Sequence, residues 1–490
     1  MGSPISDLHG RMILDSRGNP TVEVECYASI DIPSRSTVPS GASTGSYEAV
    51  ELRDGGKDWV GKGVDLAIEN INGKIKEALI GIDVSEQNTI DQIMIELDNT
   101  SNKSNLGANA ILGVSLACLR AAAGVGYPLW SHISSEEECS LPVPLMNILN
   151  GGAHANSEVD VQEFMIVPHG FTNFKDALRA GVEIYHTLKT VLKENQLLTG
   201  VGDEGGFAPN LPCNEDGLIY VVQAIESAGY KPGKQVSIAL DVAAQEFLEG
   251  DKYHFDGKLI SGIELANIYS NWIKKYPIVS IEDPFGEDDW DSWIEFTKKE
   301  GNNIQIVGDD LYVTNPERLI RGIEKSASNA ILIKLNQIGT FTETMNVIKM
   351  AKDAGFATII SHRSGETSDE IISDIAVGTN AGQIKTGAPA RSDRTSKYNQ
   401  LLRISEVCEK IGANWSDISI ALKLDRRIGK YAYLEPGLGI SGGNLERDLY
   451  TLQKLQASNR LNNRFIQELK NKSISRKLWI LNVVKKLKKK

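Results

Sequence analysis

The chain has 490 residues, of which 41% are hydrophobic and 24% charged, and it carries a formal net charge of −12. This composition is typical of a globular protein with about three domains, or fewer if one of them is a barrel, and it excludes disordered, collagen-like and disulfide-stapled small proteins. No run of about 18 apolar residues is present and residues 1–16 lack the regions of a secretory signal, so we expect neither a membrane-spanning helix nor a leader. The five cysteines are far apart and form no CxxC motif, which predicts free thiols in a reducing cytoplasm.

Charge is distributed unevenly along the chain. Residues 405–490 contain 18 Lys and Arg against 8 Asp and Glu, which leaves 34 basic and 56 acidic residues in the rest of the chain. An acidic body repels nucleic acid, so we expect no nucleic-acid partner at the main domain. The basic end indicates a separate C-terminal extension, residues 413–490. It is compatible with an amphipathic helix that contacts acidic lipid or a partner, and the alternatives are a solvated extension or sequence without a selected role.

Residues 1–135 have the pattern of a small α+β domain. Residues 12–30 indicate two strands on either side of a turn, because residues 15–20 (DSRGNP) are rich in turn-forming types. A loop rich in Gly and Ser, residues 38–46, follows, and the Ala- and Leu-rich stretch 109–123 has helical periodicity. By its composition alone, the loop is an ordinary flexible turn.

From residue 136 to about residue 412, short apolar runs alternate with amphipathic stretches of helical length. This alternation predicts a parallel sheet covered by helices. Eight runs are present, at residues 144–150, 162–168, 236–240, 278–281, 304–307, 330–333, 358–361 and 383–384. Eight strands favour a closed barrel over an open sheet, so we predict an α/β fold with an eight-stranded, TIM-like βα barrel.

A side chain of catalytic or ligand type follows almost every late apolar run. These residues are Asp241, Glu282, Asp309, Lys334, His362 and Lys385. The C-terminal ends of barrel strands form the rim on which active sites are built. Each residue alone could be a solvated residue at a strand end, but all of them in register indicate one pocket.

The acidic members of this set predict a metal site. Asp241, Glu282 and Asp309 cannot all stay ionised in one pocket without a cation, and carboxylate oxygens without accompanying thiols select Mg²⁺. A surface acidic cluster that binds nothing is the alternative. Lys334 and Lys385 would share the pocket, and we expect the cation and the second ammonium to lower the pKa of Lys334 until it can act as a base. Either lysine taken alone could instead be a salt-bridge residue.

A second group of polar residues lies on loops and strand ends earlier in the barrel region. It comprises the segment 150–154 with His154, the pair Gln162 and Glu163, and the glycine-rich segment 201–206 with Glu204. Glu204 is placed to act as a general acid if its surroundings raise its pKa. One base and one acid on opposite sides of a small substrate suit an elimination. The segment His362, Arg363, Ser364 supplies the group types that hold phosphate.

Several long segments identify the chain with a known family. They are LDSRGNPTVEVE, VPSGASTG, NLGANAILGVSLA, NGGAHANSEVDVQEFMI, GVGDEGGFAPN, YPIVSIEDPF, IKLNQIGT, SHRSGET and QIKTGAPARSDR, in one order over about residues 7–412. In these segments the chain resembles the enolase (phosphopyruvate hydratase) family. The resemblance implies an enolase-type barrel that begins with a ββαα unit, preceded by the smaller α+β domain.

The resemblance also implies a reaction, the reversible Mg²⁺-dependent dehydration of 2-phospho-D-glycerate to phosphoenolpyruvate. Lys334 would be the base and Glu204 the acid, helped by Glu163. One Mg²⁺ would bind Asp241, Glu282 and Asp309, and Ser40 in the loop 38–46, acting as a lid, would bind a second that arrives with substrate. The residues expected to position the small phosphorylated substrate are His154, Gln162, Glu163, Ser361, His362, Arg363, Ser364 and Lys385.

Further expectations concern assembly, location and departures from the family pattern. The resemblance implies a homodimer or a larger assembly of dimers in the cytoplasm, with a secondary location at the cell surface and plasminogen binding through C-terminal lysines as an additional role. A non-catalytic binding protein on the enolase scaffold is the alternative, and another barrel enzyme that abstracts a proton beside a carboxylate is a third. Gln245 stands where the family usually has Ser, which we expect to be tolerated, and the sequence beyond residue 413 lacks the usual short acidic terminus.

Overall fold

The computed structural model describes residues 3–28, 32–41, 45–124, 127–134, 139–152 and 158–410. His154, part of the predicted lid loop and the extension 413–490 lie outside the described residues. The chain divides into two units, Met1–Leu401 and Leu402–Lys490, and the fold described below is that of the first. A domain boundary at residue 135 stays a prediction.

The N-terminal part contains a three-stranded antiparallel sheet with the order β1-β2-β3. Its strands are β1 (Asp7–Leu14), β2 (Pro20–Tyr27) and β3 (Ser34–Thr37). The carboxylate of Asp15 closes the turn between β1 and β2, because Oδ1 accepts hydrogen bonds from the backbone N–H groups of Arg17 and Asn19, each at 2.8 Å. The predicted pair of strands around a turn is therefore confirmed.

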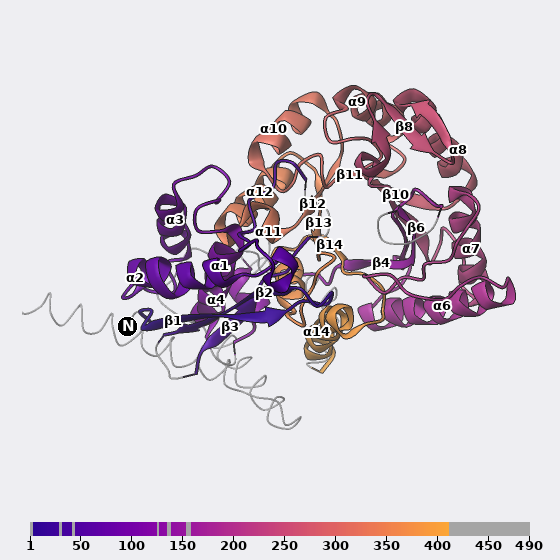
Figure 1. The fold of residues 1–490 in the computed structure, drawn as a ribbon. Helices are drawn as coiled ribbons and strands as arrows, with labels where there is room; N and C mark the ends of the chain where they lie inside the picture. The colour runs from indigo at the N-terminus through magenta and orange to yellow at the C-terminus, as the bar shows by residue number, and fades with distance from the viewer. Residues whose placement is uncertain are drawn as a thin grey trace, which may run out of the picture. The chain divides into compact units, whose positions relative to one another are not determined.

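Helices α1 (Asp65–Asn70) and α4 (Ala108–Ala123) pack against this sheet (Figure 1). The same part of the chain contains α2 (Lys76–Leu79), α3 (Gln87–Asp98) and α5 (Leu129–Ile133). Helix α4 lies close to the sheet, since a Cβ added at Gly113 would lie 2.7 Å from Cγ2 of Val24. This helix matches the predicted stretch 109–123 to within one residue.

Eight strands form a closed barrel with the order β10-β11-β12-β13-β14-β4-β5-β6, which confirms the predicted fold class. The strands are β4 (Val143–Asn150), β5 (Glu163–Val167), β6 (Ser237–Asp241), β10 (Ile278–Glu282), β11 (Gln305–Gly308), β12 (Ala330–Ile333), β13 (Ala357–Ser361) and β14 (Gly382–Lys385). Each lies within one or two residues of an apolar run identified in the sequence.

The direction of β5 departs from the alternation rule. It pairs antiparallel with both neighbours, β4 and β6, whereas the other neighbouring pairs of the barrel are parallel. The prediction of a wholly parallel sheet is wrong here, because no helix separates β4 from β5 and both following helices, α6 (Phe174–Glu194) and α7 (Asn214–Ser227), precede β6. The barrel thus begins ββαα, as the family resemblance implied.

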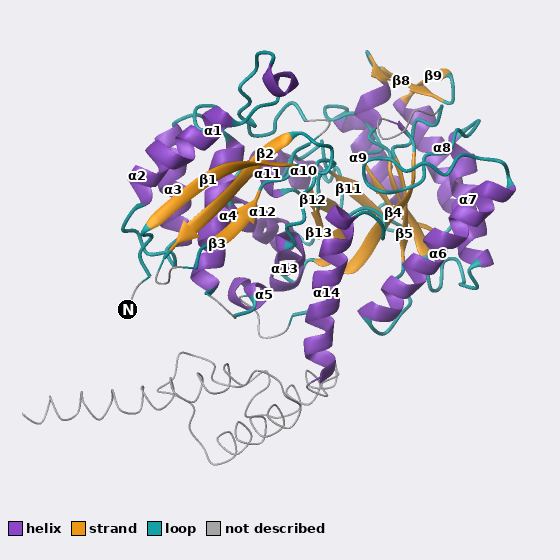
Figure 2. Cartoon of the chain, turned by 60° about the horizontal axis from the view of Figure 1, so that its bottom comes forward, coloured by secondary structure: helices purple, strands orange, loops and turns teal. Residues whose placement is uncertain are grey.

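Helices surround the barrel strands, and α6 through α10 follow one another around them in Figure 1. The remaining helices are α8 (Gly262–Lys275), α9 (Trp290–Glu300), α10 (Pro316–Lys325), α11 (Leu335–Ile338), α12 (Phe341–Asp353), α13 (Ile371–Gly378) and α14 (Ser392–Lys410). In chain order, a small antiparallel sheet of β7 (Leu248–Glu249), β8 (Lys252–Phe255) and β9 (Lys258–Ser261) follows β6 and precedes α8, against which β8 and β9 lie (Figure 2). Of the helices that the structure describes, none has the length and apolar character needed to cross a bilayer.

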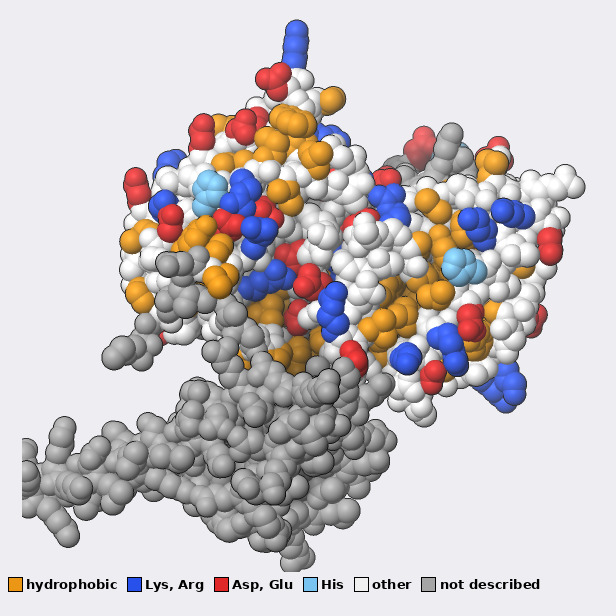
Figure 3. All heavy atoms as spheres, turned by 90° about the horizontal axis from the view of Figure 1, so that it is seen from below, with side chains coloured by type: hydrophobic (Ala, Val, Ile, Leu, Met, Phe, Trp, Pro, Cys, Tyr) orange, Lys and Arg blue, Asp and Glu red, His pale blue; other side chains and the backbone are white. Residues whose placement is uncertain are grey.

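Apolar side chains fill the barrel. Leu145, Met165, Val167, Ala239, Val307, Ala330, Leu332 and Ile359 form one buried cluster. Burial of such side chains contributes about 1.5–3 kcal/mol each for the larger ones. On the molecular face drawn in Figure 3, acidic and basic side chains are interspersed with apolar ones.

Candidate active site

The C-terminal ends of the barrel strands bring most of the predicted residues to one cavity. Those that line it are Gln162, Glu163, Glu204, Asp241, Asp309, Lys334, Ser361, His362, Arg363, Ser364 and Lys385. The strand ends explain this convergence: Asp241, Glu282, Ser361 and Lys385 are each the last residue of a strand. Asp309 and Lys334 each follow their strand directly. The cavity volume is about 30 Å³, above the roughly 10–15 Å³ that one water molecule needs.

The reversed direction of β5 has a consequence for the site. Glu163 is the first residue of β5, and it pairs with Asp241, the last residue of β6. Because β5 runs against its neighbours, its beginning lies at the rim where they end. A carboxylate that opens a strand therefore joins carboxylates that close strands.

The ammonium of Lys385 lies at the centre of this acidic group. Its Nζ is 2.8 Å from Oδ2 of Asp241, 2.9 Å from Oε1 of Glu282 and 3.4 Å from Oε1 of Glu163. Burial opposes the charge of Lys385, but the surrounding carboxylates raise its pKa well above the ordinary value. The ammonium of Lys385 thus supplies part of the positive charge that these carboxylates require.

Lys334 forms an ion pair with Asp309. Burial opposes the charge of Lys334, yet the attraction of Asp309 and Glu282 gives a pKa above the ordinary lysine value. The predicted lowering of the Lys334 pKa assumed a dication beside the amine and stays a prediction; the contact with Asp309 acts in the opposite direction. The prediction counted the neighbouring cations and left out the carboxylate that the fold places in direct contact with the amine.

Three acidic residues of the rim lie close enough together to hold a metal ion. Among the described residues, the ligand-type side chains whose ligand atoms all lie within 4.8 Å of one another are Asp283, Asp309 and Asp310. Asp283 has a structural explanation, because its two carboxylate oxygens accept hydrogen bonds from the backbone N–H groups of Asp309 and Asp310 at 2.9 and 2.8 Å. Of the predicted metal ligands, only Asp309 belongs to this group.

Asp241 and Glu282, the other two predicted ligands, instead converge on Lys385. Oε2 of Glu282 is buried and has no hydrogen-bond partner among the described residues. Burial raises the pKa of Glu282 well above its ordinary value, and the charge of Asp241 adds to this. A buried carboxylate oxygen without a donor is the kind of atom that a hard cation satisfies, so the chemistry of the residues fits Mg²⁺.

The predicted acid, Glu204, also lies at the cavity, in a buried group with Asn147 and His362. Glu204 is 3% exposed, and its Oε2 accepts a hydrogen bond from Nδ2 of Asn147 at 3.2 Å. The same oxygen is 3.3 Å from Nε2 of His362. Burial, reinforced by the charge of Glu204, raises the pKa of Glu163 well above its ordinary value. A proton is therefore favoured on Glu163.

The predicted phosphate-holding residues share the same rim. The guanidinium of Arg363 is paired with Glu48 through contacts of 3.0 and 3.3 Å, and both side chains are buried. The hydroxyl of Ser361 donates to the carbonyl of His362 at 3.0 Å. Ser364 lines the cavity as predicted.

Ser40 does not belong to the cavity lining that the structure describes. Its hydroxyl donates to Oε2 of Glu51 at 3.1 Å and accepts from Nη2 of Arg53 at 3.0 Å. Its backbone pairs with Gly365, next to the residues that the barrel contributes to the cavity. The predicted role of Ser40 as a metal ligand stays a prediction, and His154 lies outside the described residues.

The backbone at this rim is strained. Ala243, Asp283 and Val313 have φ values of +47°, +41° and +45°, in the left-handed region that non-glycine residues rarely adopt. They lie just beyond β6, β10 and β11 respectively. Backbone strain of this kind concentrates at functional sites, where the surrounding structure holds it in place.

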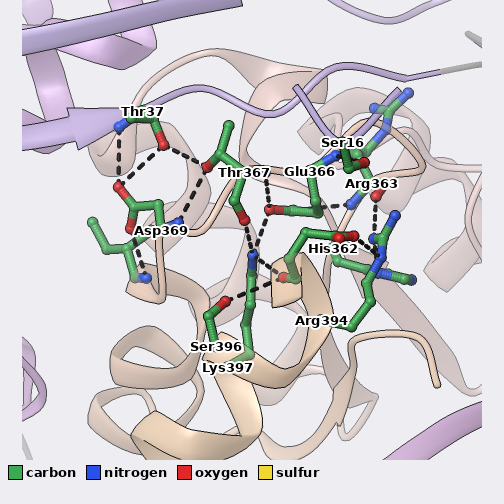
Figure 4. A network of polar contacts seen from close by, with 12 residues as sticks. Ser16, Thr37, His362, Arg363, Glu366, Thr367, Asp369, Arg394, Ser396 and Lys397 are labelled. Atoms are coloured by element: carbon green, nitrogen blue, oxygen red, sulfur yellow. Dashed lines mark hydrogen bonds and ion pairs between the residues drawn. The ribbon is translucent and has the colours of Figure 1, made fainter. Parts of the chain in front are cut away.

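Sequence reasoning missed residues that support the site from other elements. Glu48 pairs with Arg363, Gln337 donates to Oδ1 of Asp309 at 2.9 Å, and Asn147 contacts Glu204. Figure 4 shows Arg394 and Lys397 of α14 extending toward the loop that begins at His362. Arg394 is the last residue of the segment QIKTGAPARSDR, which belongs to the family resemblance and could have indicated a role for it. The sequence of this segment does not show which groups the side chain contacts.

Gln245, the departure from the family pattern, makes a defined contact. Its Oε1 accepts a hydrogen bond from the backbone N–H of Glu287 at 3.0 Å. Glu287 in turn accepts a hydrogen bond from the hydroxyl of Ser46 at 2.7 Å. The longer side chain thus supports the loop after β10, which Ser46, the last residue of the predicted lid loop, contacts.

Comparison with known families agrees with this geometry. Residues 138–417 match the family described as enolase, C-terminal TIM barrel domain, and residues 5–133 match the family described as enolase, N-terminal domain. Residues 394–472 also match the central domain of the UDP-glucose/GDP-mannose dehydrogenase family, which overlaps the enolase match at residues 394–417 and continues beyond the described residues. The enolase matches span both the sheet of the N-terminal part and the barrel whose rim carries the cavity. The chain therefore belongs to the enolase family and is a lyase of the enolase type.

Proposed function

We propose that the chain catalyses the reversible dehydration of 2-phospho-D-glycerate to phosphoenolpyruvate. The observation that carries the proposal is one cavity lined by an amine, Lys334, a buried pair of carboxyl groups, Glu163 and Glu204, and a guanidinium, Arg363. Elimination of water from this substrate needs a base for a carbon-bound proton, an acid for the departing hydroxyl, and a cationic group for the phosphate. The cavity contains a candidate for each role.

In the proposed mechanism Lys334 removes the proton from the carbon next to the substrate carboxylate. It acts in its neutral form, so its ion pair with Asp309 has to weaken before Lys334 can accept the proton. The Glu163 and Glu204 pair holds the proton that the leaving hydroxyl accepts. Arg363, with Ser364 and His362, holds the phosphate, and Lys385 faces the substrate carboxylate.

Asp241, Glu282 and Asp309 would hold the first Mg²⁺, and Ser40 would contribute to a second. Bound there, the ion supplies positive charge that stabilises the extra charge developing on the substrate carboxylate. The buried, donorless Oε2 of Glu282 supports this part of the proposal.

We also propose a cellular location and an assembly state for the chain. The cysteines Cys26, Cys118, Cys139 and Cys213 are free thiols, which supports a reducing cytoplasm. We further propose assembly into a homodimer or a larger set of dimers. Molar mass and activity, measured for the full chain and for a version that ends near residue 413, would test the assembly and the role of the basic extension.

The decisive experiment follows phosphoenolpyruvate absorbance with and without Mg²⁺, in wild type and in Lys334→Ala. We expect Mg²⁺-dependent turnover in the wild type and none in the variant, with Mg²⁺ affinity retained because Lys334 is not a ligand. Lys349→Ala is the matched control, since Lys349 is an exposed lysine of α12 that pairs with Asp353 away from the cavity. Turnover in Lys334→Ala would overturn the role of the base, and a folded wild type without Mg²⁺-dependent turnover would overturn the reaction.

A further inference from the structure

Arg394 connects α14 to both halves of the candidate site. Its side chain is fully buried. Nη1 donates to the carbonyl of Arg363 at 2.6 Å, and Nη2 donates to the carbonyls of Ser364 at 2.6 Å and Asp203 at 3.3 Å. Nη1 also contacts Nδ1 of the His362 ring (Figure 4). One guanidinium therefore holds the loop that carries Arg363 and the loop that carries Glu204.

The contact with the ring determines which nitrogen of His362 carries the proton. A guanidinium is always protonated in proteins and has donors but no acceptor. Nδ1 of His362 can approach Nη1 of Arg394 only by presenting its lone pair. In a neutral imidazole the proton then has to lie on Nε2, and an imidazolium would place two donors against each other.

The protonated nitrogen lies at the cavity. Nε2 of His362 is 3.3 Å from Oε2 of Glu204 but forms no hydrogen bond with the described residues, and both residues line the cavity. The charged groups that face the ring are Glu204 from the glycine-rich loop, Arg394 from α14 and Lys385 from β14. Burial lowers the pKa of His362 to about 3, the charge of Glu204 opposes this shift, and the charge of Arg394 reinforces it. The ring is therefore neutral throughout the physiological pH range.

Neighbouring residues of α14 keep Arg394 in place. Nζ of Lys397 donates to Oε2 of Glu366 and to the carbonyl of Thr367, each at 2.7 Å (Figure 4). The hydroxyl of Tyr398 donates to the carbonyl of Gly387 at 2.7 Å. The first turns of α14 are thus fixed to two loops of the barrel rim, but neither Lys397 nor Tyr398 donates to the imidazole.

We propose that Arg394 is a positioning residue that holds His362 as the neutral, Nε2-protonated imidazole, whose N–H is left free to donate to a ligand at the cavity. At this edge of the cavity the ring donates a hydrogen bond and does not accept a proton. It leaves the transfer of a proton to the carboxyl pair and offers its N–H to Glu204 or to a substrate oxygen. This use in catalysis rests on the proposed function, whereas the tautomer itself is a property of the free protein.

The tautomer can be measured without turnover. The full chain, labelled with ¹⁵N-histidine, has seven histidines, and the His362 signals are identified by their loss in His362→Gln. We expect a two-bond ¹H–¹⁵N spectrum in which Nδ1 has the shift of an unprotonated nitrogen and Nε2 that of a protonated one, unchanged from pH 5.5 to pH 8.5. A proton on Nδ1, or two protonated nitrogens at neutral pH, would overturn the proposal. The wild-type spectrum decides this even if variants of Arg394 fail to fold.

The influence of Arg394 is tested with Arg394→Met and Arg394→Lys, and Tyr398→Phe is the matched control on the same helix. In Arg394→Met we expect His362 to show a mixture of tautomers and kcat to fall about 10–100-fold, the usual cost of removing the partner that orients a functional histidine. Arg394→Lys should restore part of kcat, and Tyr398→Phe should retain the wild-type tautomer. A wild-type His362 spectrum in Arg394→Met would overturn the proposal. An inactive wild type with the expected spectrum would instead count against the proposed reaction alone.

Discussion

Glu48→Gln would test whether the guanidinium of Arg363 is reserved for an anionic ligand. In the structure this guanidinium is paired with Glu48 through two contacts, 3.0 and 3.3 Å long, and the side chains are 4% and 6% exposed. The adjoining cavity has a volume of about 30 Å³. A phosphate group that binds Arg363 has to compete with Glu48 for the same guanidinium N–H groups.

The expected change in phosphate affinity can be estimated from the ion pair between Glu48 and Arg363. A hydrogen bond to a charged group contributes about 1.5–3 kcal/mol net, and a ligand that displaces Glu48 has to give up this energy first. Removing the competing charge should thus tighten phosphate binding by about 10–100-fold, because each 1.4 kcal/mol corresponds to a factor of ten. The same change leaves Arg363 as a buried charge without its partner, which typically destabilises a fold by about 3–5 kcal/mol. The neutral amide still accepts a hydrogen bond, so we expect values at the lower end of both ranges.

The assay measures binding of inorganic phosphate by calorimetry and unfolding by heat, for wild type and variant. Glu343→Gln is the matched control, because Glu343 pairs with the buried Lys103 outside the cavity lining and its loss should lower stability alone. Higher phosphate affinity together with lower stability is specific to the proposed competition. Phosphate affinity that is unchanged or weaker in Glu48→Gln would refute the reasoning.

Three further predictions follow from the geometry. Glu282→Gln should weaken Mg²⁺ binding because it removes a charge from the proposed ligand set, and an unchanged affinity by calorimetry would count against that set. Burial raises the pKa of Asp374 from 3.8 to about 6, so stability is full below the unfolded-state pKa and declines as pH rises through 6. Asp374→Asn should therefore gain about 2 kcal/mol over wild type between pH 4 and pH 8, as measured by chemical unfolding at each pH. A Cβ at Gly217 would lie 2.5 Å from Cζ of Phe164, so Gly217→Ala should cost about 1–3 kcal/mol in thermal unfolding, whereas Gly73→Ala, where the space is open, should not.

The barrel strands could be predicted from the sequence because each is a short, buried apolar run. The run 278–281 became β10, Ile278–Glu282, and the run 330–333 became β12, Ala330–Ile333. Strand direction could not be predicted in this way, because a buried parallel strand and a buried antiparallel strand can have the same apolar sequence pattern. The small sheet at residues 248–261 was missed as well, since its strands are short and alternate in burial.

Some residues of the candidate site could likewise be predicted from the sequence, and others could not. Residues at strand ends, such as Asp241 and Lys385, could be predicted because the barrel itself brings strand ends together. Glu48 is 315 positions from its partner Arg363, and no local pattern indicates that contact. The effect of Asp309 on the pKa of Lys334 was missed for a related reason, because it depends on a contact between two side chains and not on residue types alone.

The lining of the cavity carries more acidic than basic side chains, and this excess bears on both metal binding and substrate binding. The described lining contains seven carboxylates, Glu48, Glu163, Glu204, Asp241, Asp283, Asp309 and Asp310, against three cationic side chains, Lys334, Arg363 and Lys385. Two like charges about 4 Å apart repel each other by about 4 kcal/mol near a protein surface, so this excess is tolerated only with protons or cations. The raised pKa of Glu163 and the ion pairs of both lysines compensate part of it. A substrate that is both a phosphate and a carboxylate would enlarge the excess, and its binding therefore has to be coupled to the release of Glu48 and to the uptake of positive charge.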